Sequence, residues 1–483
     1  MIPRIYNILV KKWKTLKRHI ERAIVGAFVL DKKSHTITEP HNVHYKNLQK
    51  CYLIAFYLST FADWLQGPYI YKLYSDYGYT DDTIAILYIT GFASSCIFGI
   101  LVGQMADRFG RKLLCSTFGI FYTLCCLSKT SPRFIVLLTG RILGGISTSI
   151  LFTTFEAWYV NEHLNFYKLP PEWLNMTFTK ATFYNGLSAI IAGIVAQVLA
   201  EYFAFGPVSP FLFSIPFLLS SFLVIQSTWK EHPALPTKPV SNNWFSGLCD
   251  PLKLLFNDDK LLLYLGIIQF IFEAVMYTYI FSWTPILTNL KPPLGLIFSM
   301  FMVSLMGGSK LYASLIARHY YSQNLLIFTT ILATFSFCIV TLSLTHIVVH
   351  VETHDIEPST MKSMSLLCLS AFLVYEFSVG MYYPAVGYLR SRVIPEECRA
   401  SLSNWFRVPM NIITCLTLLL NAGNRAKEIS SLKKFQILFS LCTIMLVGAI
   451  CVSVVFAKKY SKKIIHDEIN DLRAGKSQSS ETV

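Results

Sequence analysis

The sequence predicts an all-α polytopic membrane protein with twelve transmembrane helices in two sets of six. Three observations predict this class: an apolar composition, a series of apolar runs of spanning length, and a one-sided distribution of Lys and Arg. Hydrophobic residues make up 53% of the 483 residues and charged residues only 14%, whereas soluble domains have about 45–50% and about 25%. So few charges cannot keep that much apolar surface in water, so lipid must surround the outer faces.

Twelve runs are long and apolar enough to cross a bilayer, because a spanning helix needs about 20 mostly apolar residues. A polar stretch separates the runs into two sets of six, and the other gaps are short. The predicted spans are 49–74, 84–106, 113–130, 134–160, 175–203, 209–228, 261–288, 295–317, 324–347, 365–389, 400–421 and 435–457.

These runs divide the chain into five parts. A basic N-terminal segment precedes the first six-helix half, a cytoplasmic linker joins the halves, and a cytoplasmic tail without regular structure follows the second half. The expected parts are 1–48, 49–228, 229–260, 261–458 and 459–483.

The distribution of Lys and Arg predicts the orientation. With both termini and every second gap on one side, that side holds 28 of the 42 Lys and Arg, the opposite gaps hold 7, and 7 lie within spans. Basic loops stay on the cytoplasmic side of a membrane. We therefore expect both termini and the linker to be cytoplasmic, and we do not expect a nucleic acid as the partner of the net charge of +14.

The N-terminal segment 1–48 has its own pattern. Ile5, Leu9, Trp13 and Leu16 recur at helical spacing with lysines between them. Such a segment can lie on an anionic membrane surface, which is our interpretation. The alternative is an organelle presequence, because no acidic residue precedes Glu21.

The cysteines do not predict a metal site or a disulfide framework. Twelve cysteines lie mostly inside apolar runs, without CxxC or Cys/His spacing. The sequence also has no nucleotide-binding loop and no nucleophile motif. We therefore expect neither an enzyme nor a cofactor, and we expect a monomer surrounded by membrane lipids.

The gap between the second and third spans carries a glycine, acid and base pattern. Its defined positions are Gly103, Asp107, Arg108, Gly110, Arg111 and Lys112. This pattern matches the G-x-x-x-D-R-x-G-R-K signature of the major facilitator superfamily, in the gap where that family carries it. Gly103 should let helices approach, Gly110 should permit a tight turn, and the three bases should anchor the cytoplasmic end. The resemblance implies that Asp107 holds the two halves together through the start of the eleventh helix, a favourable place for a carboxylate.

One cation lies deep in the fourth span. Arg141 follows Gly140 in a Gly-Arg-Ile-Leu-Gly-Gly stretch that resembles a second signature of the superfamily. A charge near the bilayer centre costs at least about 2.5–3.5 kcal/mol. Arg141 must therefore face a cavity or a partner.

Four acids lie in the first, fourth, seventh and tenth spans. They are Asp63, Glu156, Glu273 and Glu376. These spans occupy equivalent places in the four three-helix repeats of a major facilitator fold and line its central cavity. We interpret the acids as substrate-binding or coupling groups, with a proton or another cation as the coupling ion; the alternative is a set of salt bridges that only fix packing. Lys180 and Arg407, in the cytoplasmic half of their spans, are predicted to act at a gate or latch.

Several blocks narrow the resemblance to one family. Ala62 to Tyr69, Ile84 to Tyr88, Phe155 to Tyr159, Trp283 to Pro285 and Asn404 to Pro409 are similar to those of the molybdate-anion transporter family. The resemblance implies uptake of the molybdate oxyanion. Arginine suits tetrahedral oxyanions, so Arg141, Arg407 and Lys180 are the candidate anion ligands.

The predicted mechanism is alternating access of the two halves about a midplane site, as a molybdate symporter with protons. We expect the plasma membrane, with an intracellular organelle membrane as the alternative. Two other functions stay open at this point. One is a carrier for a sugar, peptide or organic anion, and the other is a non-transporting receptor or scaffold on the same fold.

Overall fold

The computed structural model describes residues 42–170, 172–232, 260–290, 292–352, 358–393 and 428–480. All regular structure in these ranges is helical, which confirms the predicted all-α class. The chain forms two compact units, residues 1–50 and 51–483. Of the first unit, the predicted surface helix lies outside the described residues. Its last residues begin a helix at Val43, where the Asn42 side chain accepts a hydrogen bond of 2.9 Å from the His44 amide and caps the first turn.

The first half contains the six predicted spans. The helices are α2 (Val43–Gln66), α3 (Ile70–Asp76), α4 (Asp81–Phe109), α5 (Arg111–Ser128), α6 (Phe134–Asn161), α7 (Glu172–Gln197) and α8 (Ser209–Thr228). A short 3₁₀ turn, Gly67–Tyr69, separates α2 from α3, because Pro68 in its first turn has no amide hydrogen to continue the α-helix. Two π-turns, Glu162–Phe166 and Val198–Tyr202, extend α6 and α7.

The second half is described except for one span. Its helices are α10 (Lys260–Leu287), α11 (Leu294–Ala317), α12 (Ser322–Glu352), α13 (Pro358–Val393) and α15 (Glu428–Ser480), with a 3₁₀ turn at Thr288–Leu290. The predicted eleventh span, 400–421, lies outside the described residues, as does most of the linker. The tail differs from our expectation, because α15 continues to Ser480 and residues 459–480 are helical. The end of an apolar run does not end a helix when polar residues of good helix propensity follow it.

Nine of the described helices are long and apolar enough to cross a membrane. The first and third predicted spans, α2 and α5, are helical but less apolar. Lys46, Lys50 and Asp63 lie in α2, and Arg111 and Lys112 begin the 18-residue α5. The chain is therefore an integral, multi-pass membrane protein.

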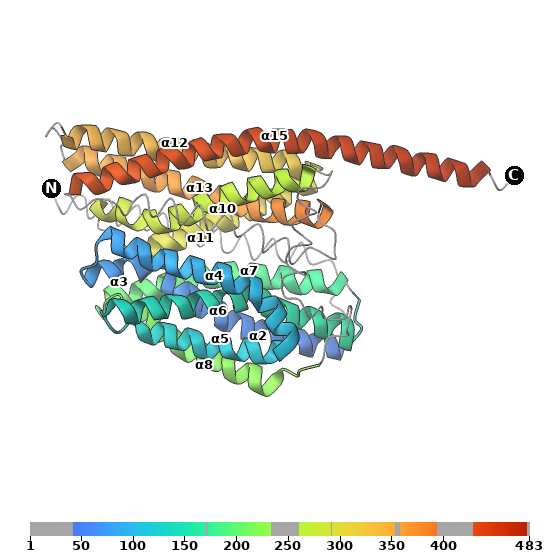
Figure 1. The fold of residues 1–483 in the computed structure, drawn as a ribbon, viewed down its shortest axis with the longest axis horizontal. Helices are drawn as coiled ribbons and strands as arrows, with labels where there is room; N and C mark the ends of the chain where they lie inside the picture. Colours follow the sequence, from blue (N-terminus) through green and yellow to red (C-terminus); the bar gives the residue numbers. More distant parts are fainter. Residues whose placement is uncertain are drawn as a thin grey trace. The chain divides into compact units, whose positions relative to one another are not determined.

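Helices within each half pack through small residues. In the first half α6 packs on α4 and α5, and in the second half α12 packs on α13 and α15 (Figure 1). A Cβ on Gly145 of α6 would lie 2.6 Å from the Gly91 carbonyl oxygen of α4. A Cβ on Gly308 of α11 would lie 1.9 Å from the Phe377 carbonyl oxygen of α13. Such contacts are typical of membrane helices, where van der Waals packing replaces a hydrophobic driving force.

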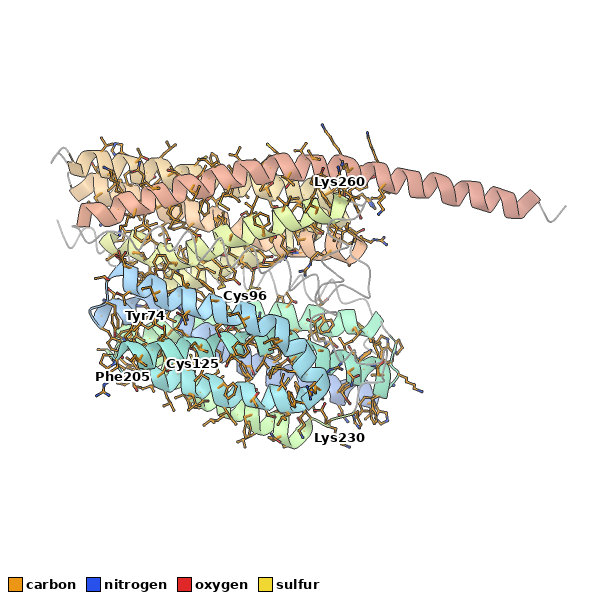
Figure 2. The ribbon with its side chains drawn as sticks, in the orientation of Figure 1. Tyr74, Cys96, Cys125, Phe205, Lys230 and Lys260 are labelled. Carbon is orange, nitrogen blue, oxygen red and sulfur yellow. The ribbon has the colours of Figure 1, made fainter. Side chains whose placement is uncertain are left out.

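The helices of the first half have two distinguishable ends. Figure 2 shows Tyr74 and Phe205 at one end of these helices and Lys230 at the opposite end. We name these the outer end and the inner end, after the orientation that the Lys and Arg predict. The residues of the candidate site lie between these two ends.

Candidate functional site

The side chain of Arg141, on α6, contacts the neighbouring helix α4. Its Nε donates a 3.0 Å hydrogen bond to the Leu87 carbonyl, and its guanidinium carbon lies 5.0 Å from the centre of the Tyr88 ring. A Cβ on Gly91 would lie 2.6 Å from Arg141 Nη2, so the glycine makes room for the guanidinium. Within the described residues no protein group accepts a hydrogen bond from the two terminal nitrogens. The side chain is half-buried.

Asp63 contacts the neighbouring helix α5. The hydroxyl of Tyr122, a buried residue of α5, donates a hydrogen bond to Asp63 Oδ1. Tyr122 in turn packs edge-on against Phe118, with ring centres 5.5 Å apart. A charge-assisted hydrogen bond of this kind satisfies one carboxylate oxygen.

Glu273 and Glu376 lie in one tyrosine cluster of the second half. Both carboxylates are buried, with 9% and 7% of each residue exposed. The Tyr382 hydroxyl lies 3.5 Å from Glu273 Oε1, and Tyr375 interacts electrostatically with both acids. Tyr279 of α10 lies close to Glu376. The structure therefore brings together two of the predicted acids, on α10 and α13, amid phenolic hydroxyls.

Glu156 lies nearer the inner end of α6 and is exposed. Among the described residues its carboxylate makes no hydrogen bond or ion pair, and Arg390 of α13 is the cation that acts on it electrostatically. Lys180 of α7 is half-buried, and its backbone carbonyl accepts a 3.0 Å hydrogen bond from Tyr57. Arg407 lies outside the described residues.

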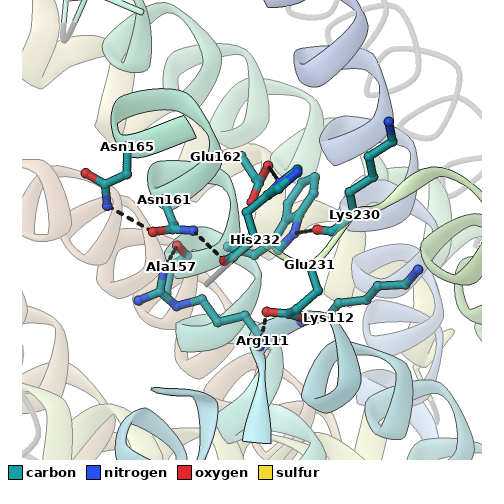
Figure 3. A network of polar contacts seen from close by, with 10 residues as sticks. Arg111, Lys112, Ala157, Asn161, Glu162, Asn165, Lys230, Glu231 and His232 are labelled. Atoms are coloured by element: carbon teal, nitrogen blue, oxygen red, sulfur yellow. Dashed lines mark hydrogen bonds and ion pairs between the residues drawn. The ribbon is translucent and has the colours of Figure 1, made fainter. Parts of the chain in front are cut away.

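The signature connects the end of α4 to the start of α5. Gly110 has φ = 97°, a left-handed conformation that favours glycine, so the predicted tight turn is present. The Glu231 carboxylate accepts hydrogen bonds from the backbone amides of Arg111, at 2.9 Å, and Lys112, at 2.6 Å (Figure 3). A Cβ on Gly110 would also lie 3.0 Å from the Glu231 carboxyl carbon. The glycine is therefore needed for its backbone conformation and for the approach of this acid.

The basic side chains of the signature hold neighbouring helix ends. Arg111 Nη1 donates to the Ala157 carbonyl at 3.3 Å, and Lys112 Nζ donates to the Gln226 carbonyl at 3.1 Å. Arg108 is exposed and lies over the Phe109 ring. No atom lies within 4 Å of a Cβ placed on Gly103 in the described part of the chain, so the predicted close approach is not made there. The side chain of Asp107 lies outside what the structure describes.

Glu231 belongs to the start of the linker, residues Trp229 to His232, which we call the linker strap. The indoles of Trp229 and Trp158 stack with centres 3.7 Å apart and planes 9° apart. Trp158 Nε1 also donates a 3.0 Å hydrogen bond to the Lys230 carbonyl. The strap is thus fixed to the inner end of α6 by both stacking and hydrogen bonding.

His232 makes a second attachment of the strap. Its ring stacks on Phe166 with centres 3.4 Å apart, and its Nδ1 lies 2.7 Å from Glu162 Oε2. The side-chain nitrogen Nδ2 of Asn161 donates a hydrogen bond to the His232 backbone carbonyl at 3.3 Å (Figure 3). Glu162 and Phe166 lie in the π-turn after α6, a feature that often marks functional positions.

The two halves touch near the outer end through α7 and α11. Gln197 Oε1 accepts hydrogen bonds from the Gly295 amide at 2.9 Å and from the Tyr69 hydroxyl at 3.0 Å. A Cβ on Gly295 would lie 2.2 Å from the Gly193 carbonyl oxygen. The helices therefore meet backbone to backbone, and Gln197 caps the first turn of α11.

Further contacts join the halves at the same end. Lys434 Nζ of α15 lies 3.2 Å from Asp82 Oδ1 of α4. The rings of Tyr88 and Phe281 are 5.3 Å apart, and those of Phe92 and Tyr277 are 4.7 Å apart, both edge to face. Tyr88 is also the ring under Arg141, so the outer contact surface adjoins the arginine.

Lys129, at the end of α5, is a buried cation that the sequence analysis did not single out. It is fully buried, and its Nζ donates a 2.9 Å hydrogen bond to the Tyr74 hydroxyl. Its carbonyl accepts a 2.5 Å hydrogen bond from Tyr77, and burial raises the pKa of Tyr77 above its ordinary value. Only its position at a helix end, between apolar runs, could have suggested burial.

The predicted site residues divide between the two halves. No group of three His, Cys, Asp or Glu within the described ranges could hold a metal ion. Arg141 offers unused donors, while Glu273 and Glu376 form a separate acidic cluster in the other half. Sequence reasoning found these residues but missed Glu231, Gln197 and Lys129, whose partners are distant in the chain.

Comparisons with known proteins identify the family. A family described as sugar transporters with 12 transmembrane helices matches residues 20–374. The chain is 38% identical over 434 residues to a protein named molybdate-anion transporter from Takifugu rubripes, covering 85% of this chain and 87% of that protein. A protein of the same name from Danio rerio is 38% identical over 406 residues, covering 80% and 81%. The one from Xenopus tropicalis is 37% identical over 425 residues, covering 86% and 87%.

Solved structures agree on the fold. A mutant form of the nucleoside transporter NupG superposes with a TM-score of 0.64 at 12% identity, covering 85% of this chain and 99% of that one. A POT family peptide transporter gives 0.63 at 11% identity, with 86% and 96% covered. The inward-open xylose transporter XylE from E. coli gives 0.59 at 10% identity, with 83% and 95% covered. The chain therefore has the major facilitator fold and belongs to the molybdate-anion transporter family.

Proposed function

We propose that this protein carries molybdate across its membrane by alternating access, with Arg141 as the principal ligand of the oxyanion. The names of the relatives in three vertebrates support the substrate. The single observation that carries the site is the guanidinium of Arg141, whose Nε donates to Leu87 and whose two terminal nitrogens have no acceptor among the described residues. A planar fork of N–H donors matches the edge of a tetrahedral oxyanion.

The contacts near the outer end support a state closed to the outside. Gln197 with Gly295, and Asp82 with Lys434, join the halves there. Transport requires that these contacts break while contacts at the inner end form. Asp107 is proposed to stabilise the inner-closed state, and Glu156, Lys180 and Arg407 to act near the inner gate.

Proton coupling is the proposed driving force. A dianion entering a path lined by carboxylates is repelled unless those acids are protonated or paired. Glu273 and Glu376 share one tyrosine cluster in the second half, so protonation of one lowers the charge that the other faces. Asp63, with its Tyr122 partner, is the corresponding acid of the first half.

We further propose that the protein is a monomer in the plasma membrane with both termini cytoplasmic. The Lys and Arg distribution supports this orientation. In intact cells, an impermeant probe should not reach a tag at either terminus, and it should reach the tag once the plasma membrane is permeabilised.

Uptake of labelled molybdate into liposomes holding the purified protein tests the function. We expect uptake to rise with an inward proton gradient and to be lost in Arg141→Ala. Arg133→Ala is the matched control, because Arg133 lies at the start of the same helix and is exposed. If Arg141→Ala keeps normal uptake while folded, the anion site lies elsewhere. Absence of transport of any solute would favour a receptor or scaffold.

A second candidate substrate is a sugar. The family described as sugar transporters matches most of the chain, and the half-buried indole of Trp64 is an aromatic surface on which a sugar ring can stack. Competition decides between the substrates. Excess sulfate or tungstate should reduce molybdate uptake, whereas excess hexose should not. A hexose that competes, and is itself transported, would make the sugar the substrate.

A further inference from the structure

Lysines gather where α15 leaves its apolar stretch. Lys458, Lys459, Lys462 and Lys463 lie within six residues near the end of the apolar segment Leu432–Ile464. No Asp or Glu occurs between residues 429 and 464. The first acids after this stretch are Asp467 and Glu468, so Lys458, Lys459 and Lys462 are each at least five residues from an acid in the chain.

The helical spacing turns two of these lysines away from the protein. Phe456 and Tyr460 are buried, and their rings stack with centres 5.6 Å apart, so this row of α15 faces the other helices. Lys458 and Lys462 each follow one of these rings by two residues, about 200° around the helix. Both are exposed. Their ammonium groups therefore lie on the lipid-facing side.

The cationic surface extends onto α10. Lys459 Nζ lies 3.3 Å from the Tyr264 hydroxyl and 4.9 Å from the centre of its ring. Lys260 is exposed and begins α10, one turn before Tyr264 on the same row. Figure 2 shows Lys260 beside α15. We call Lys260, Lys458, Lys459 and Lys462 the lysine patch.

The surface next to the patch is apolar. On α15, Ile444, Val447 and Val455 are exposed, with 69%, 48% and 40% of each residue accessible. These residues lie toward the middle of the apolar segment, and the lysines lie at its end. An amphiphile with a negative head and apolar chains matches both surfaces at once, whereas a free phosphate ion matches only the lysines.

We propose that the lysine patch binds the headgroups of anionic phospholipids in the leaflet at the inner end, with their acyl chains along α15. The proposal names the cytoplasmic leaflet because it rests on the proposed orientation; it is independent of the transported substrate. Basic residues close to an anionic leaflet each contribute about 1 kcal/mol. Such lipids would fix the inner end of the second half relative to the membrane surface.

Native mass spectrometry of the purified full-length protein with phosphatidylserine or phosphatidylcholine tests the proposal. Wild type should bind phosphatidylserine more tightly. K458Q/K462Q should weaken that binding about thirtyfold, because about 1 kcal/mol per lysine is about fivefold each. K458R/K462R should keep the affinity. Lys433→Gln is the matched control, since it removes an exposed lysine at the other end of the same helix.

The lipid-binding results test this proposal independently of the transport assay. Equal binding of the two lipids by wild type, or an unchanged phosphatidylserine affinity in K458Q/K462Q, would overturn the proposal. So would equally tight binding of soluble glycerophosphoserine, because the patch would then be a phosphate site without a lipid requirement. Loss of preference for phosphatidylserine in the double variant, with intact preference in Lys433→Gln, supports it even if molybdate is not the substrate.

Discussion

The Glu231 carboxylate stabilises the start of α5 because the first amides of a helix have no partner within the helix. Its two oxygens accept from the amides of Arg111 and Lys112, and the positive end of the helix dipole adds to the attraction. The bases of the signature thus act through their backbone as well as their side chains. An acid of the linker thus caps a helix whose first two residues precede it by 120 and 119 positions in the chain.

Glu231→Ala should therefore destabilise the inner end of the first half. Loss of a side-chain cap costs about 0.5–2 kcal/mol, so we expect a lower midpoint of thermal unfolding in detergent and faster protease cleavage in the linker. Lys230→Ala is the control, because the structure uses only the backbone carbonyl of Lys230. Equal cleavage rates in the two variants would contradict the capping role.

A double substitution tests the buried Lys129. Tyr74→Phe removes the hydroxyl that accepts from Lys129 Nζ, and leaving a buried donor unpaired costs about 1–3 kcal/mol, or more for a charged group. Adding Lys129→Met should recover most of that stability, since an apolar chain of similar length needs no acceptor. Thermal unfolding of the single and double variants measures both effects. A double variant no more stable than Tyr74→Phe would show that the ammonium is not the cause.

At the scale of elements, the contact between α7 and α11 depends on the absence of side chains. Gly193 and Gly295 face each other so closely that the Gly193 carbonyl would lie 2.2 Å from a Cβ on Gly295. Ser299 Oγ adds a 2.9 Å hydrogen bond to the Ile190 carbonyl. These helices belong to different halves, so their contact is available only while the outer end is closed.

Gly295→Ala should disfavour this closed state. Overpacking costs about 1–3 kcal/mol, and we expect slower molybdate uptake together with greater access of impermeant thiol reagents to a cysteine placed at the buried Leu294. Gly448→Ala is the control, because nothing lies within 4 Å of a Cβ there. Unchanged uptake and unchanged access in Gly295→Ala would rule out a role for this contact in closure.

The spans could be predicted from the sequence because lipid requires a long apolar run, and every predicted span that falls within the described ranges is helical. The pairing of Gln197 with Gly295 could not, because no local pattern marks which helices of different halves approach. The burial of Lys129 could not be predicted for a related reason: a lysine at a helix end normally reaches water, and only the position of Tyr74 on another helix allows its burial. The helical tail of α15 was missed because apolar periodicity ends before the helix does.

At the scale of the whole molecule, a charged pair joins the first and second halves. Lys434 and Asp82 are 3.2 Å apart and partly exposed, so solvent screens their attraction. Such a pair is worth about 0.2–1 kcal/mol. This is small against the stability of a fold, yet it biases an equilibrium between two states of similar free energy.

A charge swap tests this pair. Lys434→Asp places two acids together and should shift the protein about two- to fivefold toward the outward-open state, seen as greater labelling from outside. The double variant D82K/K434D restores an attractive pair and should return labelling toward wild type. If the double variant labels as strongly as Lys434→Asp alone, the two side chains do not act on each other.

The parallel indoles of Trp158 and Trp229 give the inner end its own optical reporter. Two tryptophans at van der Waals distance couple electronically through their strong indole transitions, so the attached linker strap should add a pair of bands of opposite sign to the circular dichroism spectrum. Detachment of the strap separates the rings and removes this pair, while the bands of the helical backbone stay the same. The movement of the connection between the halves during a transport cycle can thus be followed without adding a dye.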